Sequence, residues 1–174
     1  MEQILRDLTD VLKAVPEAET GPFLDALVRA QRVFMYGLGR SGLAARMFGM
    51  RLVHLGRKST IVGDTTTPAI GADDLLVVCS RTGQSPILRH AVDLAHREGA
   101  IAAAVVGVPS TPLAGDADLV VRIPLEVARG EARQPMGSLF EQTLLLYLDR
   151  IVMDLMDALK KTPEDMERIH SNLP

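Results

Sequence analysis

The sequence predicts an α/β fold in which helices cover both faces of a parallel β-sheet. Short apolar runs of β type alternate with segments of helical periodicity, as expected of βαβ units. These runs contain almost no polar residues, which is typical of parallel strands buried on both faces. The 174 residues are 47% hydrophobic and 24% charged. The length and composition fit one domain with a substantial core.

Two helices precede the first strand. Ile4, Leu8 and Val11 share a face at helical spacing, and Pro16 ends that helix. The period then changes at a short apolar run, which a glycine turn connects to the next helix. The predicted elements of this half are helices over 2–14 and 20–31, a strand over 33–36, a helix over 41–55 and a strand over 59–62.

The second half continues the alternation. Strands are predicted over 74–79, 101–106 and 118–123, with a helix over 85–98 that Gly99 closes. The polar segment 124–136 contains Arg129, Glu131 and Arg133 and is interpreted as a surface loop near a site or an interface. A helix over about 138–160 is apolar around much of its circumference, so it is buried in the core or between subunits.

The whole chain, 1–174, is interpreted as a single domain. Its parts are N-terminal helices over 1–31, a βα core over 33–123, the long helix over 137–160 and a tail over 163–174.

Composition narrows the class of partner. The net charge of −3 gives no reason to expect a nucleic acid, because nucleic-acid-binding domains are usually basic. No apolar run reaches the roughly 18 residues of a membrane span, so no membrane partner is expected. The N-terminus lacks the apolar stretch of a signal peptide, and Cys79 is the only cysteine. These features predict a cytoplasmic protein.

The clearest functional signal is a pair of glycine- and hydroxyl-rich turns, each following an apolar strand. The first turn, 37–42, reads Gly-Leu-Gly-Arg-Ser-Gly, and the second, 80–85, reads Ser-Arg-Thr-Gly-Gln-Ser. On neighbouring parallel strands, the two turns would bring hydroxyls, backbone N–H groups and helix N-termini around one anion. The sequence therefore predicts a phosphorylated small molecule as the ligand.

The first turn by itself also satisfies the dinucleotide-binding pattern G-x-G-x-x-G. Asp64, just after the second strand, is then the candidate ribose ligand, but it lies 22 residues beyond Gly42, only a loose match. The dinucleotide interpretation also leaves the second turn unexplained, so it is the weaker alternative.

The second turn is the better anion site. Ser80, Thr82 and Ser85 supply hydroxyl donors, and Gly83 allows close approach of the backbone. Arg81 either adds positive charge or lies in solvent. Ser85 on its own is equally suited to capping the helix that follows. Cys79, at the end of the strand, is interpreted as a buried small apolar residue.

Glu141 is the candidate general base. Two roles are open for it. The run from Ser138 to Glu141 has the S-x-x-E pattern of a capping box, which the local sequence favours. Flanked by Phe140 and Leu144, however, the carboxylate would be partly desolvated and suited to proton abstraction.

The four histidines show no metal-ligand spacing, so no metal is expected. No cofactor is expected either. His90 and His96 have charged neighbours and are expected to be exposed. His54, in the last turn of its helix, is suited to the helix dipole and is a minor site candidate. His170 lies in the tail, from which it could reach a neighbouring subunit.

Several motifs together resemble the 6-phospho-3-hexuloisomerase family of sugar-isomerase (SIS) domains. The match covers the chain from about Val33 onward, with the motifs in the family's order. The matching segments are Gly-Leu-Gly-Arg-Ser-Gly at 37–42, Met-Arg-Leu-Val-His-Leu-Gly at 50–56, Gly-Asp-Thr-Thr-Thr-Pro at 63–68, Gln-Pro-Met-Gly-Ser-Leu-Phe-Glu-Gln-Thr at 134–143 and His-Ser-Asn-Leu at 170–173.

The resemblance implies a flavodoxin-like three-layer αβα sandwich with a five-stranded parallel sheet, no metal, and a homotetramer with sites near subunit interfaces. It implies interconversion of D-arabino-hex-3-ulose 6-phosphate and D-fructose 6-phosphate, a step of formaldehyde fixation in the ribulose monophosphate pathway. Glu141 would be the base and His170 an assisting group across an interface. The residues implied to bind substrate are Ser41, Ser80, Arg81, Thr82, Gly83, Gln84 and Ser85.

The second turn departs from the family pattern, which commonly reads Ser-Gly-Ser-Gly-Glu-Thr. Arg81 replaces a glycine and Gln84 replaces a glutamate, while the hydroxyls are retained. Two alternatives therefore stay open: an aldose–ketose isomerase acting on another phosphosugar, and a phosphosugar-binding module without catalysis.

Overall fold

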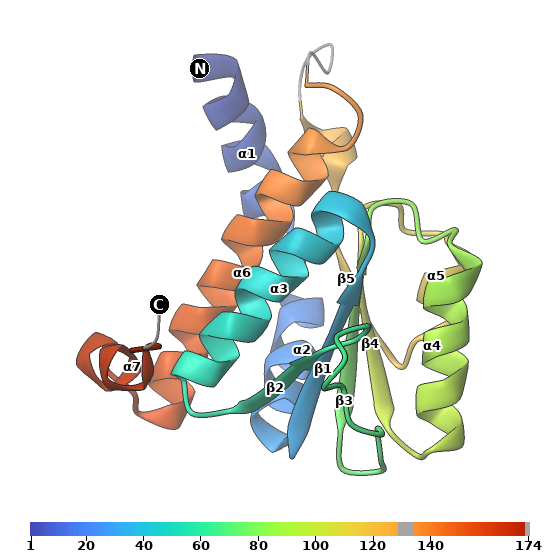
Figure 1. Ribbon diagram of the computed structural model, residues 1–174. Helices are drawn as coiled ribbons and strands as arrows, with labels where there is room; N and C mark the ends of the chain where they lie inside the picture. Colours follow the sequence, from blue (N-terminus) through green and yellow to red (C-terminus); the bar gives the residue numbers. More distant parts are fainter. Residues whose placement is uncertain (129–133, 173–174) are drawn as a thin grey trace.

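A computed structural model describes residues 1–128 and 134–172 of the chain, and Figure 1 shows its arrangement. Five strands form one parallel sheet in the order β2-β1-β3-β4-β5, which confirms the predicted fold class. The strands are β1 (Arg32–Gly37), β2 (Lys58–Ile61), β3 (Leu75–Ser80), β4 (Ile101–Val106) and β5 (Leu119–Arg122).

Helices cover both faces of the sheet. The helices α1, α2, α3 and α6 lie on one face, and α4 and α5 lie on the other (Figure 1). The main helices are α1 (Glu2–Ala14), α2 (Glu17–Arg29), α3 (Gly39–His54), α4 (Pro86–Arg97) and α6 (Ser138–Leu159). None of the helices in the described ranges is long and apolar enough to cross a membrane.

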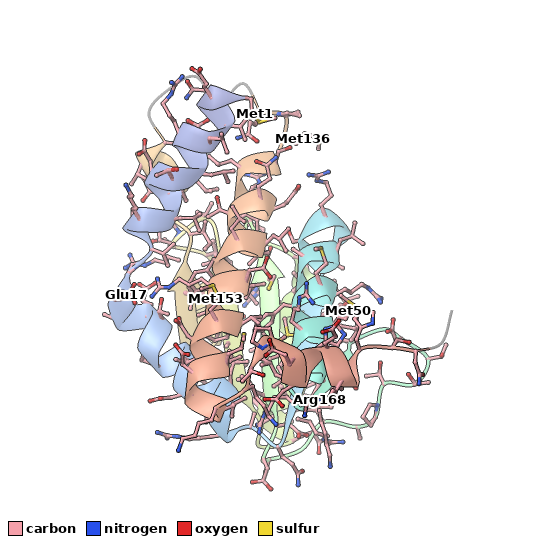
Figure 2. All side chains as sticks on the ribbon, turned by 90° about the vertical axis from the view of Figure 1, so that its left-hand side faces the viewer. Met1, Glu17, Met50, Met136, Met153 and Arg168 are labelled. Atoms are coloured by element: carbon pink, nitrogen blue, oxygen red, sulfur yellow. The ribbon has the colours of Figure 1, made fainter. Side chains whose placement is uncertain are left out.

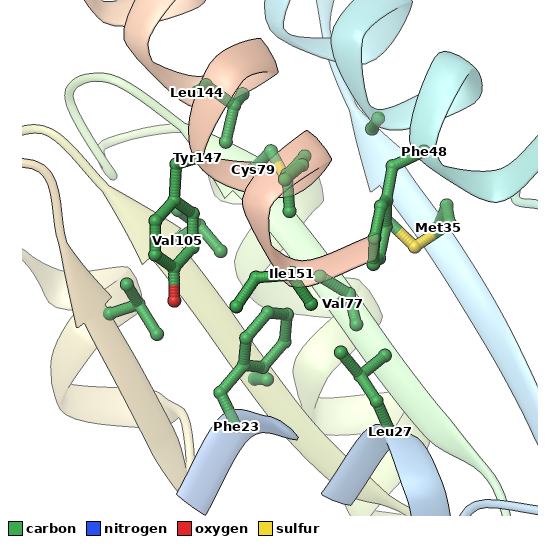
Figure 3. Packing of buried hydrophobic residues seen from close by; sticks show 14 of the residues in the cluster. Phe23, Leu27, Met35, Phe48, Val77, Cys79, Val105, Leu144, Tyr147 and Ile151 are labelled. Carbon is green, nitrogen blue, oxygen red and sulfur yellow. The ribbon is translucent and has the colours of Figure 1, made fainter. Parts of the chain in front are cut away.

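The central strand β3 is fully buried because both faces of the sheet are covered. Every residue of β3 is buried, as its uninterrupted apolar run predicts. On the α6 face, Phe23 and Phe48 pack with Tyr147 and Ile151 of α6 over the sheet (Figure 3). The long helix α6 is therefore a core helix along one side, which the apolar pattern predicted.

Three short elements were not predicted. They are α5 (Pro112–Asp116), the single 3₁₀ turn η1 (Leu125–Val127) and α7 (Pro163–Ile169). The tail over 163–174 thus contains a helix, which Thr162 starts with a capping box closed by Asp165. Arg129, Glu131 and Arg133 of the predicted loop, and Leu173 of the tail motif, lie outside the described residues.

The strand order fixes where a ligand can bind. The chain leaves β1 towards β2 on one side and leaves β3 towards β4 on the other. The loops after β1 and β3 therefore diverge at a topological switch point, where open α/β sheets bind their ligands. The order is flavodoxin-like and differs from that of the classic dinucleotide-binding fold.

Candidate functional site

The two predicted turns lie side by side at the carboxyl edge of the sheet. Gly37 at the end of β1 is paired with Cys79 of β3, so the turns follow neighbouring strands. Gly42 packs directly on Gly37. A Cβ at Gly42 would lie only 2.8 Å from the carbonyl carbon of Gly37, so the third glycine allows α3 to start against its own strand.

The N-termini of two helices, α3 and α4, lie at these two turns. Leu38 is the N-cap of α3, and Ser85 is the N-cap of α4, as predicted. The Ser85 side chain makes no capping hydrogen bond, however, so its predicted hydroxyl cap is wrong. Neither helix has a side-chain cap at its N-terminus, and the first-turn N–H groups lack partners within their helices. Such a pair of N-termini is suited to binding an anion.

The second turn is held in shape from within. The backbone N–H of Gly83 donates to Ser80 Oγ over 3.1 Å, and Ser80 is only 8% exposed. The hydroxyl of Ser80 therefore shapes the turn, while its proton remains available to a ligand. Thr82 and Ser85 are half-buried, and Arg81 and Gln84 are exposed.

Thr111 forms a wall of the site that the sequence analysis missed. Its hydroxyl caps α5 by accepting from Ala114 N over 3.2 Å. The Leu113 N–H donates to Gly83 O over 3.2 Å, which fixes α5 against the second turn. The T-P pair at 111–112, a typical start of a helix, was the available signal.

Replacing Gly83 by alanine is expected to destabilise the protein strongly. Gly83 has φ +59°, and a Cβ there would lie 2.6 Å from Thr111 Cβ. A left-handed non-glycine residue costs about 1–2 kcal/mol before the steric conflict is added. We expect the melting temperature to fall by about 4–8 °C. Gly115→Ala in α5 is the matched control, since nothing lies within 4 Å of its Cβ position; equal melting of the two variants would contradict this account.

Glu141 lies in the first turn of α6 and is paired with Arg40 of α3. Arg40 Nε donates to Glu141 Oε2, and the carboxylate side chain is 15% exposed. The predicted capping box is wrong: Gly137 is the N-cap, and Ser138 Oγ donates to Pro135 O over 2.9 Å instead. Glu141 is thereby left available for chemistry.

The Arg81 side chain also lies near Glu141, where both side chains border Gly137. An atom at the Cβ position of Gly137 would lie 3.1 Å from Arg81 Nε and 3.5 Å from Glu141 Oε1. The Arg81 side chain therefore lies across Gly137, beside the carboxylate. The structure brings together one of the predicted substrate-binding residues and the predicted base.

Two hollows flank this group. One, of about 240 Å³, is lined by Asp7, Arg81, Leu125, Ala128, Gln134, Met136, Gly137, Leu139 and Phe140. The other, of about 210 Å³, is lined by Arg40, Leu43, Ala44, Met47, Glu141, Gln142 and Leu145. A larger hollow lies at the opposite edge of the sheet, lined in part by Asp74 and Asp118, and contains none of the predicted site residues.

His54 and His170 meet at the other end of α3. Their ring centroids are 5.1 Å apart, and His54 is buried while His170 is exposed. Arg40 and His54 are 14 residues apart on one helix, about 21 Å along its axis. Within one chain, the structure does not bring His170 to Glu141.

The contribution of His54 to the stability of the protein depends on pH. Burial, the neighbouring His170 and then Arg51 lower the pKa of His54 below its ordinary value of 6.5. Because the unfolded chain binds the proton more readily, the contribution of neutral His54 is complete above pH 6.5 and is lost as the pH falls from there towards the folded pKa. We expect the fall in melting temperature over this range to be smaller in His54→Gln than in the wild type, measured by circular dichroism. His90→Gln, an exposed position, is the control; an unchanged pH dependence in His54→Gln would contradict the assignment.

The remaining candidate residues lie in the core, in ion pairs or on the surface. Cys79 is fully buried, which confirms it as a core residue, and this burial raises the pKa of its thiol to about 12. Asp64 pairs with Arg46 over 2.8 Å. His90 and His96 are exposed, as predicted, and His96 contacts Asp118. No group of three or more potential metal ligands occurs in the described part of the chain.

Comparison with known proteins identifies similar chains. The sequence profile of the SIS domain matches residues 26–148. The 3-hexulose-6-phosphate isomerase of Bacillus subtilis is 35% identical over 98% of this chain and 95% of its own. The protein of that name from Mycobacterium gastri is 39% identical over 98% of this chain and 88% of its own.

A solved structure is similar over the same extent. A hypothetical protein from Methanococcus jannaschii, for which a function as 3-hexulose-6-phosphate isomerase was inferred, superposes with a TM-score of 0.86. It is 31% identical, and the match covers 99% of this chain and 98% of that one.

Proposed function

The chain belongs to the SIS-domain family of 3-hexulose-6-phosphate isomerases, and from this membership and the site we propose that it interconverts D-arabino-hex-3-ulose 6-phosphate and D-fructose 6-phosphate. This reaction is a step of the ribulose monophosphate pathway, and the protein would act in the cytoplasm. The observation that carries the proposal is the partly buried Glu141 beside the two glycine- and hydroxyl-rich turns.

The turns supply the phosphate site. Two helix N-termini without side-chain caps converge there with the hydroxyls of the second turn, an arrangement that favours a phosphate dianion. Anchoring the phosphate places the distant C2–C3 bond of the sugar and lowers the entropic cost of reaction. The residues assigned to substrate binding are Ser41, Ser80, Arg81, Thr82, Gly83, Gln84 and Ser85.

Glu141 would move the proton between the two carbons. Starting from D-fructose 6-phosphate, the carboxylate takes the proton from C3, and the C–H electron pair forms the C2–C3 double bond. The former carbonyl electrons pass to O2, giving a cis-enediolate. Transfer of the O3 proton to O2, followed by return of the proton from Glu141 to C2, leaves the carbonyl at C3.

Proton exchange tests this proposal. We expect that incubation with D-fructose 6-phosphate in D₂O gives the 3-hexulose with deuterium at its C2. The reverse reaction places deuterium at C3 of D-fructose 6-phosphate, and NMR detects both exchanges. Exchange at C1 instead would identify an aldose–ketose isomerase. Saturable binding without exchange would identify a phosphosugar-binding module without catalysis. Either of these results would overturn the proposed reaction.

An apolar stripe on α3 supports assembly into an oligomer, which we propose to be a homotetramer. Leu43, Met47, Met50 and Val53 are 42–61% exposed along one side of α3. Figure 2 shows this face, with Met50 on α3 and Met153 on the adjacent α6. A contiguous exposed apolar surface is typical of an interface between subunits.

This apolar stripe runs along α3 between the end near Arg40 and the end near His54. A two-fold axis through the middle of α3 would pair this helix with its copy in antiparallel orientation. The end of α3 that carries Arg40, with Glu141 of α6 beside it, would then meet the partner subunit's His170. We therefore propose that His170 of one subunit assists proton transfer at Glu141 of the other. Within one chain the two residues are too far apart for this contact.

A further inference from the structure

Arg40 links the first turn to the base, and the sequence analysis gave it no role. It lies in the first turn of α3, its side chain is 66% exposed, and its Nε donates to Glu141 Oε2. Building on the proposed isomerisation, we propose that Arg40 is a further catalytic residue, whose guanidinium stabilises the negative oxygen of the enediolate.

The guanidinium has donors left for a ligand. A guanidinium carries five N–H donors in a planar fork. Only Nε of Arg40 is engaged by Glu141, and its two terminal amino groups form no hydrogen bond to any residue of the described ranges. Arg40 can therefore hold the carboxylate and a substrate oxygen at the same time.

The hollow beside Arg40 has mostly apolar walls, to which Arg40, Glu141 and Gln142 add polar groups. It has a volume of about 210 Å³ and combines the pair Arg40–Glu141 with apolar walls from α3 and α6. Gln142 also lines it, and its Oε1 is buried without a hydrogen-bond partner in the part of the chain that the structure describes. A polyhydroxylated ligand meets both needs, because a hydroxyl donates to Gln142 while an oxygen anion accepts from Arg40.

Charge movement during the reaction favours this role. As Glu141 takes the proton from C3, its negative charge is lost and a negative charge appears on O2 of the substrate. A guanidinium between the two oxygens faces one negative charge before and after the transfer, so the surroundings need little reorganisation. Because this interaction with O2 is strongest in the enediolate, it accelerates turnover more than it strengthens binding.

The test compares Arg40→Ala with Arg46→Ala. Arg46 lies on the same helix and pairs with Asp64 over 2.8 Å, so its loss removes a similar ion pair outside the hollow. We expect kcat of Arg40→Ala to fall by about 10²–10³-fold with a much smaller change in KM. Arg46→Ala should remain within about twofold of the wild type.

Chemical rescue separates catalysis from structure. Added guanidinium at millimolar concentration, far below the molar range that unfolds proteins, should raise kcat of Arg40→Ala, while the same concentration of sodium chloride should not. Arg40→Lys should recover part of kcat, because a single ammonium lacks the fork. A variant that folds but shows neither response would overturn the catalytic role.

Measurements on the wild type distinguish a failure of the proposed reaction from a failure of the proposed role of Arg40. Absence of C3 exchange in the wild type overturns the proposed reaction itself. Exchange in the wild type that is undiminished in Arg40→Ala overturns the role of Arg40 alone and leaves the reaction standing.

Discussion

Replacing Glu141 by glutamine is expected to lower kcat for D-fructose 6-phosphate by about 10³–10⁴-fold while substrate binding persists. The amide has nearly the size of the carboxylate, and its oxygen can still accept from Arg40 Nε. It cannot take a proton from carbon. In the proposed function the turns after β1 and β3 bind the phosphate, so affinity for the sugar phosphate should change little.

Calorimetric titration with D-fructose 6-phosphate and NMR exchange at C3 measure the two effects separately. Asp149→Asn is the matched control, because it makes the same chemical change at an exposed position of the same helix. We expect this control to turn over at the wild-type rate. Turnover by Glu141→Gln at a similar rate would remove Glu141 from the role of base.

The sequence predicted the sheet and the two turns because their signals are local. The apolar run of β3 reports burial on both faces, and every residue of that strand is buried. Gly37 and Gly42 lie at the predicted turn, where backbone meets backbone too closely for a Cβ at Gly42. The two turns lie next to each other, as predicted, because β1 pairs with β3.

The surroundings of Glu141 could not be predicted in the same way. The local S-x-x-E pattern favours a capping box, but Arg40, 101 residues away in sequence, pairs with the carboxylate instead. An ion pair with the tertiary neighbour replaces the reciprocal hydrogen bonds within α6. The contact of Thr111 with Gly83 and the pair of His54 with His170 are likewise products of packing between distant segments, and no spacing in the sequence indicates either contact.

Two inactive variants are expected to restore activity when they share an oligomer. His170→Ala should lose about 10²–10⁴-fold in kcat if His170 assists proton transfer. In a mixed pair, the Glu141→Gln chain still supplies His170, and the His170→Ala chain still supplies Glu141. One of the two sites in that pair is then intact. Random association of equal amounts should therefore recover roughly a quarter of the wild-type activity.

Co-expression of the two chains with different affinity tags gives the mixed oligomer, and its kcat is compared with that of each parent. The position of the residues makes the result decisive, because His170 packs on His54 at the end of α3 opposite to Arg40 and Glu141. If both groups acted within one chain, every site would lack one of them and mixing would recover nothing. Replacing Met50 by glutamate in both chains should also abolish recovery, since a charge on the apolar stripe prevents α3 from pairing with its copy.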